Sequence, residues 1–241
     1  FAILILVVFI IVVIKIYNGT STISLGFMKI KNNKEVQRLQ NRFEELNKNN
    51  NIKTYYLKLL NQAIMTINNI ESNELSKEKL ITKIHNFYDF YLHGITTTLT
   101  NGDNIHRVAI FYKYNENELK ILHGHGFSPE GKEKLRLDLY ESKAGYSFIQ
   151  QKVFHSGDIT QDSTYVVNPK SSKKYHSLLC IPIIYGDKSI GVLSVDGLKI
   201  NSFDSDDIDY LTFMANSISL ILYKELNVIF NHKTKEKEDV V

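Results

Sequence analysis

Hydrophobic residues follow three different patterns along the chain. The segment from Phe1 to Ile14 is apolar at every position. Between Lys31 and Leu46 the apolar residues recur every three or four positions, which is typical of a helix with one apolar stripe. From Tyr55 onward, helical spacing at both ends encloses apolar runs that are typical of strands. These patterns predict a terminal apolar segment, a polar linker helix and a folded domain, in that order.

The apolar run predicts a membrane anchor. The run is shorter than the ~20 residues that cross a hydrocarbon core. Further residues are expected upstream, because the chain begins with Phe rather than Met. Together with a continuation to Tyr17, they would make the segment long enough. A signal-peptide core and a buried helix are the alternatives, but no small-residue cleavage site follows and a buried helix is seldom apolar on every side. The excess of basic residues between Lys15 and Arg42 predicts a cytoplasmic domain. We therefore expect residues 1–17 to lie in the cell membrane, in a single pass or more.

The polar segment after the anchor has two weaker features. Ile23 to Ile30 is moderately apolar and could form an interfacial or re-entrant element. A parallel copy would bury the stripe of the linker helix as a short coiled coil, and packing on the domain is the alternative. The turn-favouring residues from Asn47 to Asn51 predict the end of the linker. The stripe consists of Val36, Leu39, Phe43 and Leu46.

The domain combines helices at its ends with strands between them, which predicts an α+β fold whose antiparallel sheet carries helices mainly on one face. The other face is left to loops, and therefore to a pocket. The expected parts are residues 1–17 as a membrane helix, 18–52 as a juxtamembrane and helical linker, 53–230 as the domain and 231–241 as a charged tail. The predicted elements are helices at Tyr55–Asn69 and Leu75–Leu92, strands at Val108–Tyr114 and Leu119–Gly124, a helix at Lys143–Lys152, strands at Val153–His155, Ser177–Tyr185 and Ser189–Asp196, and a helix from Asp204 to about Ile229.

Composition and charge narrow the function classes. Hydrophobic residues make up 43% of the chain and charged residues 23%, which is typical of a folded soluble domain. The net charge of +3 is small and the basic residues are interspersed with acidic ones, so no nucleic-acid partner is expected. Cys180 is the single cysteine, which excludes an internal disulfide and a zinc finger and fits a reducing compartment. The high usage of Asn, Lys and Ile suggests an A·T-rich bacterial coding sequence.

The carboxyl-terminal part of the domain carries four segments with a distinctive order and spacing. They are LHGHGFS from Leu122, KAGYSFIQQKVFHSGDITQD from Lys143, SLLCIPIIYGDKSIGVLSVDG from Ser177 and FDSDDIDYLTFMANSISLIL from Phe203. With these segments, the chain from about Leu75 to Tyr223 resembles the GAF family of small-molecule sensor domains, which are related in fold to PAS domains. The resemblance implies a GAF/PAS-like antiparallel sheet sandwiched by helices, preceded by the transmembrane helix and the linker.

In the GAF family the ligand usually lies on the sheet face away from the terminal helices, and the resemblance maps this site onto this chain. Three small or polar strand residues, Ser177, Ser194 and Asp196, are included because they interrupt apolar strands, although capping and turn hydrogen bonds would explain each of them equally well. The candidate ligand-binding residues are Gly145, Tyr146, Phe148, Ile149, Asp158, Ile159, Tyr165, His176, Ser177, Ser194 and Asp196.

Cyclic-nucleotide-binding members of the family carry an Asn-Lys pair followed by Phe-x-x-x-Asp-Glu. Phe203 and Asp207 match the second part of this pattern. However, Asp196-Gly197 stands at the strand end, and Ile208 replaces the Glu. These departures argue against recognition of a cyclic nucleotide.

Few residues in the chain are candidates for other chemistry. Family members that reduce free methionine sulfoxide use several cysteines, and bilin-binding members attach the pigment through a pocket cysteine. Cys180, in contrast, lies alone in an apolar strand and is expected to be inert. His123 and His125 alternate at a strand end and are expected not to face one pocket. They are assigned surface or hydrogen-bonding roles, as are His155 and His176. No hydrolase, metalloprotease or kinase motif is present. We therefore expect no catalytic residue, metal or cofactor, and predict that the chain is not an enzyme.

Two hypotheses for function follow. In the first, a nucleotide or metabolite fills the GAF pocket, and the signal passes through the linker helix to the membrane segment or to a separate effector protein. In the second, the domain binds no ligand and serves for dimerisation or docking, with Tyr146, Phe148 and Tyr165 filling the pocket and the helix from Asp204 forming the interface. A homodimer is expected.

Overall fold

The computed structural model describes residues 23–25, 28–30, 33–73, 75–100, 102–163, 165 and 175–238. The chain divides into two units, residues 1–54 and 55–241. The transmembrane helix predicted at residues 1–17 lies outside the described residues. Within the ranges just given, every helix falls short of the length or the apolar character that a membrane span requires.

The first unit contains a short hairpin and the start of a long helix. Strands β1 (Ile23–Leu25) and β2 (Met28–Ile30) pair antiparallel, where the sequence suggested an interfacial element. Helix α2 (Asn33–Glu71) runs without interruption through Asn47–Asn51, so the break in the helix predicted there is wrong. Asparagine in a helix interior costs less than about 1 kcal/mol relative to alanine, which the flanking helix-forming residues can offset.

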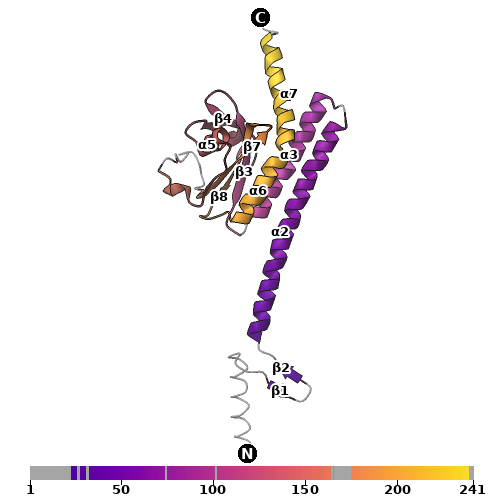
Figure 1. The fold of residues 1–241 in the computed structure, drawn as a ribbon, viewed down its shortest axis with the longest axis vertical. Helices are drawn as coiled ribbons and strands as arrows, with labels where there is room; N and C mark the ends of the chain where they lie inside the picture. The colour runs from indigo at the N-terminus through magenta and orange to yellow at the C-terminus, as the bar shows by residue number, and fades with distance from the viewer. Residues whose placement is uncertain are drawn as a thin grey trace, which may run out of the picture. The chain divides into compact units, whose positions relative to one another are not determined.

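The second unit is built on a six-stranded antiparallel sheet with the strand order β5-β4-β3-β8-β7-β6 (Figure 1). Its strands are β3 (His106–Lys113), β4 (Glu118–His125), β5 (Arg136–Asp138), β6 (Phe154–Ser156), β7 (Ser177–Tyr185) and β8 (Lys188–Gly197). Its helices, besides the end of α2, are α3 (Lys77–Leu99), α4 (Pro129–Lys134), α5 (Lys143–Gln150), α6 (Ser205–Ser217) and α7 (Ser219–Glu238), with a 3₁₀ turn at Ile159–Gln161. The predicted α+β class and antiparallel sheet are confirmed, whereas β5, α4 and the 3₁₀ turn were not predicted.

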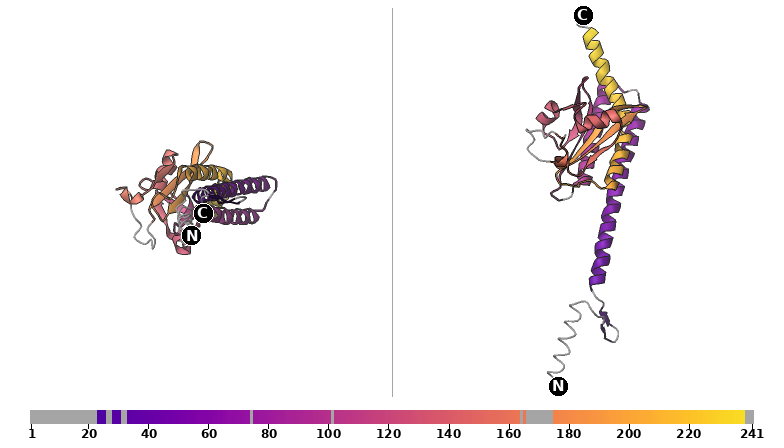
Figure 2. Two further views of the ribbon diagram at one scale, coloured as in Figure 1. Left: turned by 90° about the horizontal axis from the view of Figure 1, so that it is seen from below. Right: turned by 60° about the vertical axis from the view of Figure 1, so that its left-hand side comes forward.

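The helices form a layer on one face of the sheet, as Figure 2 shows from two further directions. Helix α3 packs on β3 and β4, and α6 and α7 pack on β7 and β8. The end of α2 joins this layer, where the ring of Tyr56 stacks on that of Tyr210 in α6 with 4.9 Å between centroids. The opposite face, called the distal face below, is covered by α5 and loops. Helices mainly on one face and loops on the other are as the sequence predicted.

Successive residues of each central strand belong to opposite layers, because side chains alternate across a sheet. On the distal face, Ala109, Phe111, Cys180 and Val192 form a core cluster with Ala144 of α5. The intervening residues face the helices and are fully buried. They include Val108, Ile110, Leu179, Leu193 and Val195.

A β-bulge interrupts the pairing of β3 with β4. Ile110 lies opposite His123 and Phe111 lies opposite Ile121, so Leu122 is the extra residue. In a regular strand His123 would share the distal face with Ile121, since residues two apart point the same way. The bulge instead turns His123 toward the helices, which is how bulges commonly re-aim a side chain.

The final helix predicted from Asp204 to Ile229 is two helices in the structure. Asp204 and Asp207 form a capping box at the start of α6, and α6 gives way to α7 at the buried residue Ile218. Helix α7 continues to Glu238, so residues 231–238 of the predicted charged tail are helical. Lys and Glu are both good helix formers, which is consistent with this extension.

Candidate functional site

The distal face carries charge where strands β3 and β8 run side by side. Arg107 and Asp196 are directly opposite in the antiparallel register, and Nε of Arg107 donates a hydrogen bond to Oδ2 of Asp196. The side chains are 24% and 13% exposed, respectively. Burial raises the pKa of Asp196, and the Arg107 charge opposes that rise. A largely buried ion pair is therefore part of this face.

Aromatic rings surround the guanidinium of Arg107. Its central carbon lies 4.6 Å from the ring centroid of Phe127 and 4.1 Å from that of Tyr175. Burial raises the pKa of Tyr165 and of Tyr175, and the negative charge of Asp196 adds to the rise for both phenols. These phenols stay protonated at neutral pH and can donate hydrogen bonds.

The guanidinium retains hydrogen-bonding capacity. Nη1 and Nη2 of Arg107 form no hydrogen bond with the residues that the structure describes. A guanidinium presents five N–H donors in a planar fork that suits a carboxylate or phosphate. The arrangement can therefore receive an anionic group beside aromatic rings.

Helix α5 forms one wall of this region. Its first turn is capped by Ser142, whose hydroxyl accepts a hydrogen bond of 2.9 Å from the Gly145 amide. Lys143 forms an ion pair of 2.6 Å with Asp162, which joins α5 to the segment after the 3₁₀ turn. A Cβ on Gly145 would lie 2.1 Å from the Leu139 carbonyl oxygen, so glycine allows the close approach of α5.

The 3₁₀ turn at Ile159–Gln161 forms a second wall, and Asp158 stabilises it. Its carboxylate accepts hydrogen bonds from the amide of Thr160 at 3.1 Å and from the hydroxyl at 2.6 Å. These bonds, chiefly the one from the hydroxyl, lower the pKa of Asp158. The imidazole of His176 lies 3.5 Å from the same carboxylate, and the His176 carbonyl accepts a hydrogen bond of 2.6 Å from the Ile159 amide. These contacts connect the 3₁₀ turn to His176, the residue before β7.

The structure brings some candidate residues together and separates others. Tyr165 and Ser194 lie with Asp196 on the distal face, where Oγ of Ser194 is 3.6 Å from Sγ of Cys180. Ser177 differs, because its position in β7 directs it to the helix side. Its hydroxyl oxygen lies 2.8 Å from the Gly157 carbonyl oxygen and 2.7 Å from the Lys199 carbonyl oxygen, and its single proton is shared between these acceptors. Among the candidates on α5, Phe148 packs against the distal core, whereas Tyr146 and Ile149 are exposed.

Sequence reasoning missed Arg107, Phe127 and Tyr175 as a group. Arg107 is a charged residue near the start of β3, at the same alternation as the apolar residues Ala109 and Phe111. A charged residue at this alternation was the one feature of the sequence that could have indicated a site on the distal face. Arg107 becomes part of an ion pair only because Asp196 lies opposite, and the sequence alone does not show that β3 pairs with β8.

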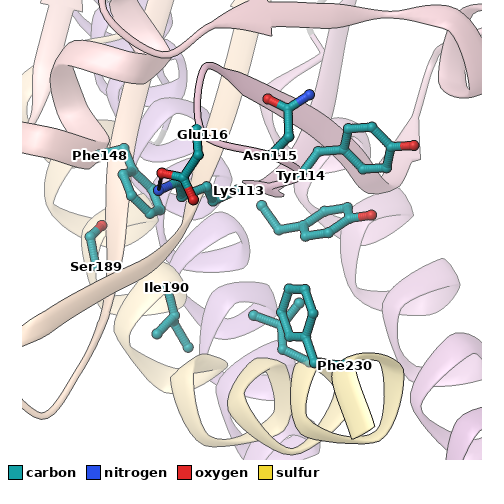
Figure 3. A pocket seen from close by; sticks show the side chains of 10 residues that line it. Lys113, Tyr114, Asn115, Glu116, Phe148, Ser189, Ile190 and Phe230 are labelled. Atoms are coloured by element: carbon teal, nitrogen blue, oxygen red, sulfur yellow. Dashed lines mark hydrogen bonds and ion pairs between the residues drawn. The ribbon is translucent and has the colours of Figure 1, made fainter. Parts of the chain in front are cut away.

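An open groove of about 380 Å³ lies elsewhere on the second unit (Figure 3). It is bordered by the turn between β3 and β4 and by α7, and it adjoins the far end of β3 from Arg107. We favour the Arg107 region as the functional site because it combines a buried ion pair with guanidinium nitrogens that form no hydrogen bond to the part of the chain that the structure describes. The groove is lined by Tyr112, Lys113, Tyr114, Asn115, Glu116, Phe148, Ser189, Ile190, Leu226 and Phe230.

The helix side of the sheet holds histidines. Nε2 of His123 lies 2.8 Å from Oε1 of Glu225 in α7, and Nε2 of His125 lies 3.4 Å from Nδ1 of His93 in α3. His123 and His125 project from the same face, because residues two apart in a strand point the same way. They contact different partners, and the expectation that they do not face one pocket stays a prediction. His85 also reaches Glu225.

Comparison with known proteins identifies the fold. A family model described as GAF domain matches residues 89–222, more than half of the chain. No curated protein matches. The GAF domain of an Acinetobacter phosphoenolpyruvate-protein phosphotransferase is 18% identical, with a TM-score of 0.56 over 71% of this chain and 95% of that one. The corresponding domain from Coxiella burnetii is 17% identical, with a TM-score of 0.57 over 71% and 94%.

A further similar structure corrects one expectation. A type II free methionine-R-sulfoxide reductase from Thermoplasma acidophilum is 14% identical, with a TM-score of 0.51 over 60% of this chain and 96% of that one. Structures of this fold thus include enzymes as well as non-enzymes, and the prediction that the chain is not an enzyme is contradicted. The likeness concerns the fold and assigns no reaction to this chain.

Burial of Cys180 predicts an unreactive thiol. Burial raises its pKa to about 12, so on the order of one molecule in 10⁴ carries the thiolate at pH 8. The native chain should therefore react with a thiol reagent at least about 100-fold more slowly than the urea-unfolded chain. Cys180→Ser is the control for labelling elsewhere, and equal rates in the two states would contradict the prediction.

Proposed function

Because the chain belongs to the GAF domain family, whose members generally bind small molecules or act in signalling, we propose that it is a membrane-anchored sensor. Its ligand is a small anionic metabolite or nucleotide that binds on the distal face of the sheet. Ligand binding changes the packing of the helices on the opposite face. The linker helix or a partner protein carries the change onward.

The observation that carries this proposal is the placement of Arg107. Its guanidinium lies near the rings of Phe127 and Tyr175 and uses Nε to hold Asp196. A carboxylate or phosphate would accept hydrogen bonds from the Nη groups in a bidentate arrangement. Asp196 fixes the orientation of the guanidinium before the ligand arrives, which lowers the ordering cost of binding.

A route for the signal is supported by the register of the sheet. The strands that carry Arg107 and Asp196 also carry Val108 and Val195, which face the helix layer. A shift of either strand on ligand binding would therefore alter the packing of helices. Such a response requires that the ligand bind one of the two arrangements more tightly than the other. Helix α2, continuous from Asn33 to Glu71, supports transmission along the linker.

A thermal-shift screen tests the ligand and its site. Nucleotides, organic acids and amino acids are added to the purified chain, and a ligand at 100 times its Kd should stabilise the protein by about 2.7 kcal/mol, a rise in Tm of roughly 5–10 °C. Arg107→Gln should weaken binding by about 10- to 100-fold, because a hydrogen bond to a charged group is lost. The matched control is Arg136→Gln, in which the replaced guanidinium lies on β5. If the ligand raises the Tm of Arg107→Gln as much as that of the wild-type chain, the ligand binds elsewhere.

Membrane attachment is a separate part of the proposal, supported by the apolar run from Phe1 to Ile14. When expressed in bacteria, the full chain should sediment with membranes and resist extraction by alkaline carbonate. A chain that lacks residues 1–17 should remain in the supernatant. Recovery of the full chain in the soluble fraction would refute the anchor.

Exposed apolar residues on α2 favour a second candidate function, dimerisation. Leu39, Phe43, Leu46, Leu57 and Ile64 are each more than half exposed, although large apolar side chains are usually covered. All five fit one repeat of alternating three- and four-residue steps, which suits a parallel coiled coil with a second copy of the helix.

Sedimentation of the full chain in detergent tests the dimer. The wild-type chain should sediment as a dimer, and Leu57→Glu should convert it to a monomer because a buried charge would face its own copy. Lys58→Glu, one position along the same helix and outside the repeat, should remain dimeric. A stable dimer with no ligand-induced shift in Tm would favour the docking role over the sensor.

A further inference from the structure

Glu225 is a charged residue in an unusual place. It lies in α7, facing the sheet, with a side chain that is 1% exposed. An ionised carboxylate so far from water requires compensation by positive charge or by several hydrogen bonds. The groups that reach it among the described residues are the imidazoles of His85 in α3 and His123 in β4.

Both imidazoles present the same nitrogen to the carboxylate. Nε2 of His123 lies 2.8 Å from Oε1 and 3.0 Å from Oε2 of Glu225, and Nε2 of His85 lies 3.5 Å from Oε1. The three ligand atoms lie within 4.8 Å of one another. The two rings approach edge to face, with 5.0 Å between centroids.

This geometry is close to that of a metal site. Zinc binds histidine nitrogen and carboxylate oxygen at about 2.0–2.2 Å, so tetrahedral ligand atoms lie roughly 3.4 Å apart. The 3.5 Å between Nε2 of His85 and Oε1 of Glu225 already matches this separation. Small side-chain rotations would bring Nε2 of His123 to the same separation from the other two ligand atoms. Two imidazoles and one carboxylate suit zinc and similar transition metals rather than magnesium or calcium, which prefer oxygen ligands.

We propose that His85, His123 and Glu225 bind one divalent transition-metal ion, with zinc as the expected ion. The site lies on the helix side of the sheet, opposite the Arg107 region, and does not depend on the sensor function proposed above. Three protein ligands leave a coordination position for water or another small ligand. Because His85 is 55% exposed and the other two ligands are buried, the ion would enter past His85.

A second observation comes from Tyr88. Its ring stacks on that of His123 with 4.3 Å between centroids, and its hydroxyl is buried without a hydrogen-bond partner among the described residues. Buried polar groups are normally satisfied, and exceptions commonly mark an ion or water that has not been accounted for. A water bound to the metal would supply a partner beside the cluster.

The metal would connect three elements that are distant in sequence. Its ligands come from α3, from the bulged end of β4 and from α7. Binding of an ion that favours the folded state stabilises that state by mass action. Occupancy of this site would therefore fix α7 against the sheet.

The test uses the full chain, stripped of metal with a chelator and titrated with Zn²⁺ and, in parallel, with Co²⁺. We expect saturable binding of one ion per chain, a rise in Tm with Zn²⁺, and visible Co²⁺ absorption bands of nitrogen and oxygen coordination. His85→Gln should weaken binding by at least about 10-fold, as loss of a ligand exceeds the effect of disturbing an outer-shell partner. Because His85 is exposed, this variant is expected to fold.

Two further variants complete the test. Glu225→Gln keeps the shape of the side chain but removes its charge, and should also weaken binding. His93→Gln is the matched control, since His93 lies on the same helix and contacts His125 rather than Glu225. The proposal is overturned if the wild-type chain binds no stoichiometric Zn²⁺ at micromolar concentrations. It is also overturned if His85→Gln binds as tightly as the wild-type chain, or if His93→Gln alone abolishes binding.

Discussion

The pairing of β3 with β8 is the constraint on which the rest of the second unit depends. These two strands are covered on both faces, so each residue must fit one of two layers. Their register places Arg107 opposite Asp196 on the distal face and Val108 opposite Val195 under the helices. A slip of one residue would exchange the two sets and bury the ion pair among helices. The fold and the candidate site are therefore specified by the same ladder of hydrogen bonds.

Buried charge is placed differently on the two faces. On the distal face, Asp196 is compensated by an arginine, whose charge is permanent. On the helix side, Glu225 is compensated by imidazoles, whose charge depends on protonation or on a bound ion. Removing either carboxylate's partner would leave an uncompensated charge in a poorly solvated place. Both pairs also link elements that are far apart in the sequence.

Sequence reasoning succeeded where local pattern determines structure. The hairpins β3–β4 and β7–β8 follow from apolar runs separated by turn residues, and α3 from its helical spacing. It failed where structure depends on distant partners. The role of Arg107 requires knowledge of the facing strand, and the orientation of His123 requires the bulge at Leu122, an apolar residue with no local mark. Helix α2 continues through a run of asparagines because turn preference is weak beside the cooperativity of a long helix.

The bulge at Leu122 makes the pairing of β4 as important as its composition. A deletion of Leu122 would restore a regular ladder and leave His123 opposite Ile110, whereas a regular ladder that kept Leu122 would turn residues 123–125 over, so that His123 would leave the helix side without any change of its own identity. Substitutions along β4 adjust the chemistry of a face, whereas the bulge decides which face receives the residues that follow it. The position at which the ladder accommodates its extra residue therefore determines which side chain of β4 meets α7.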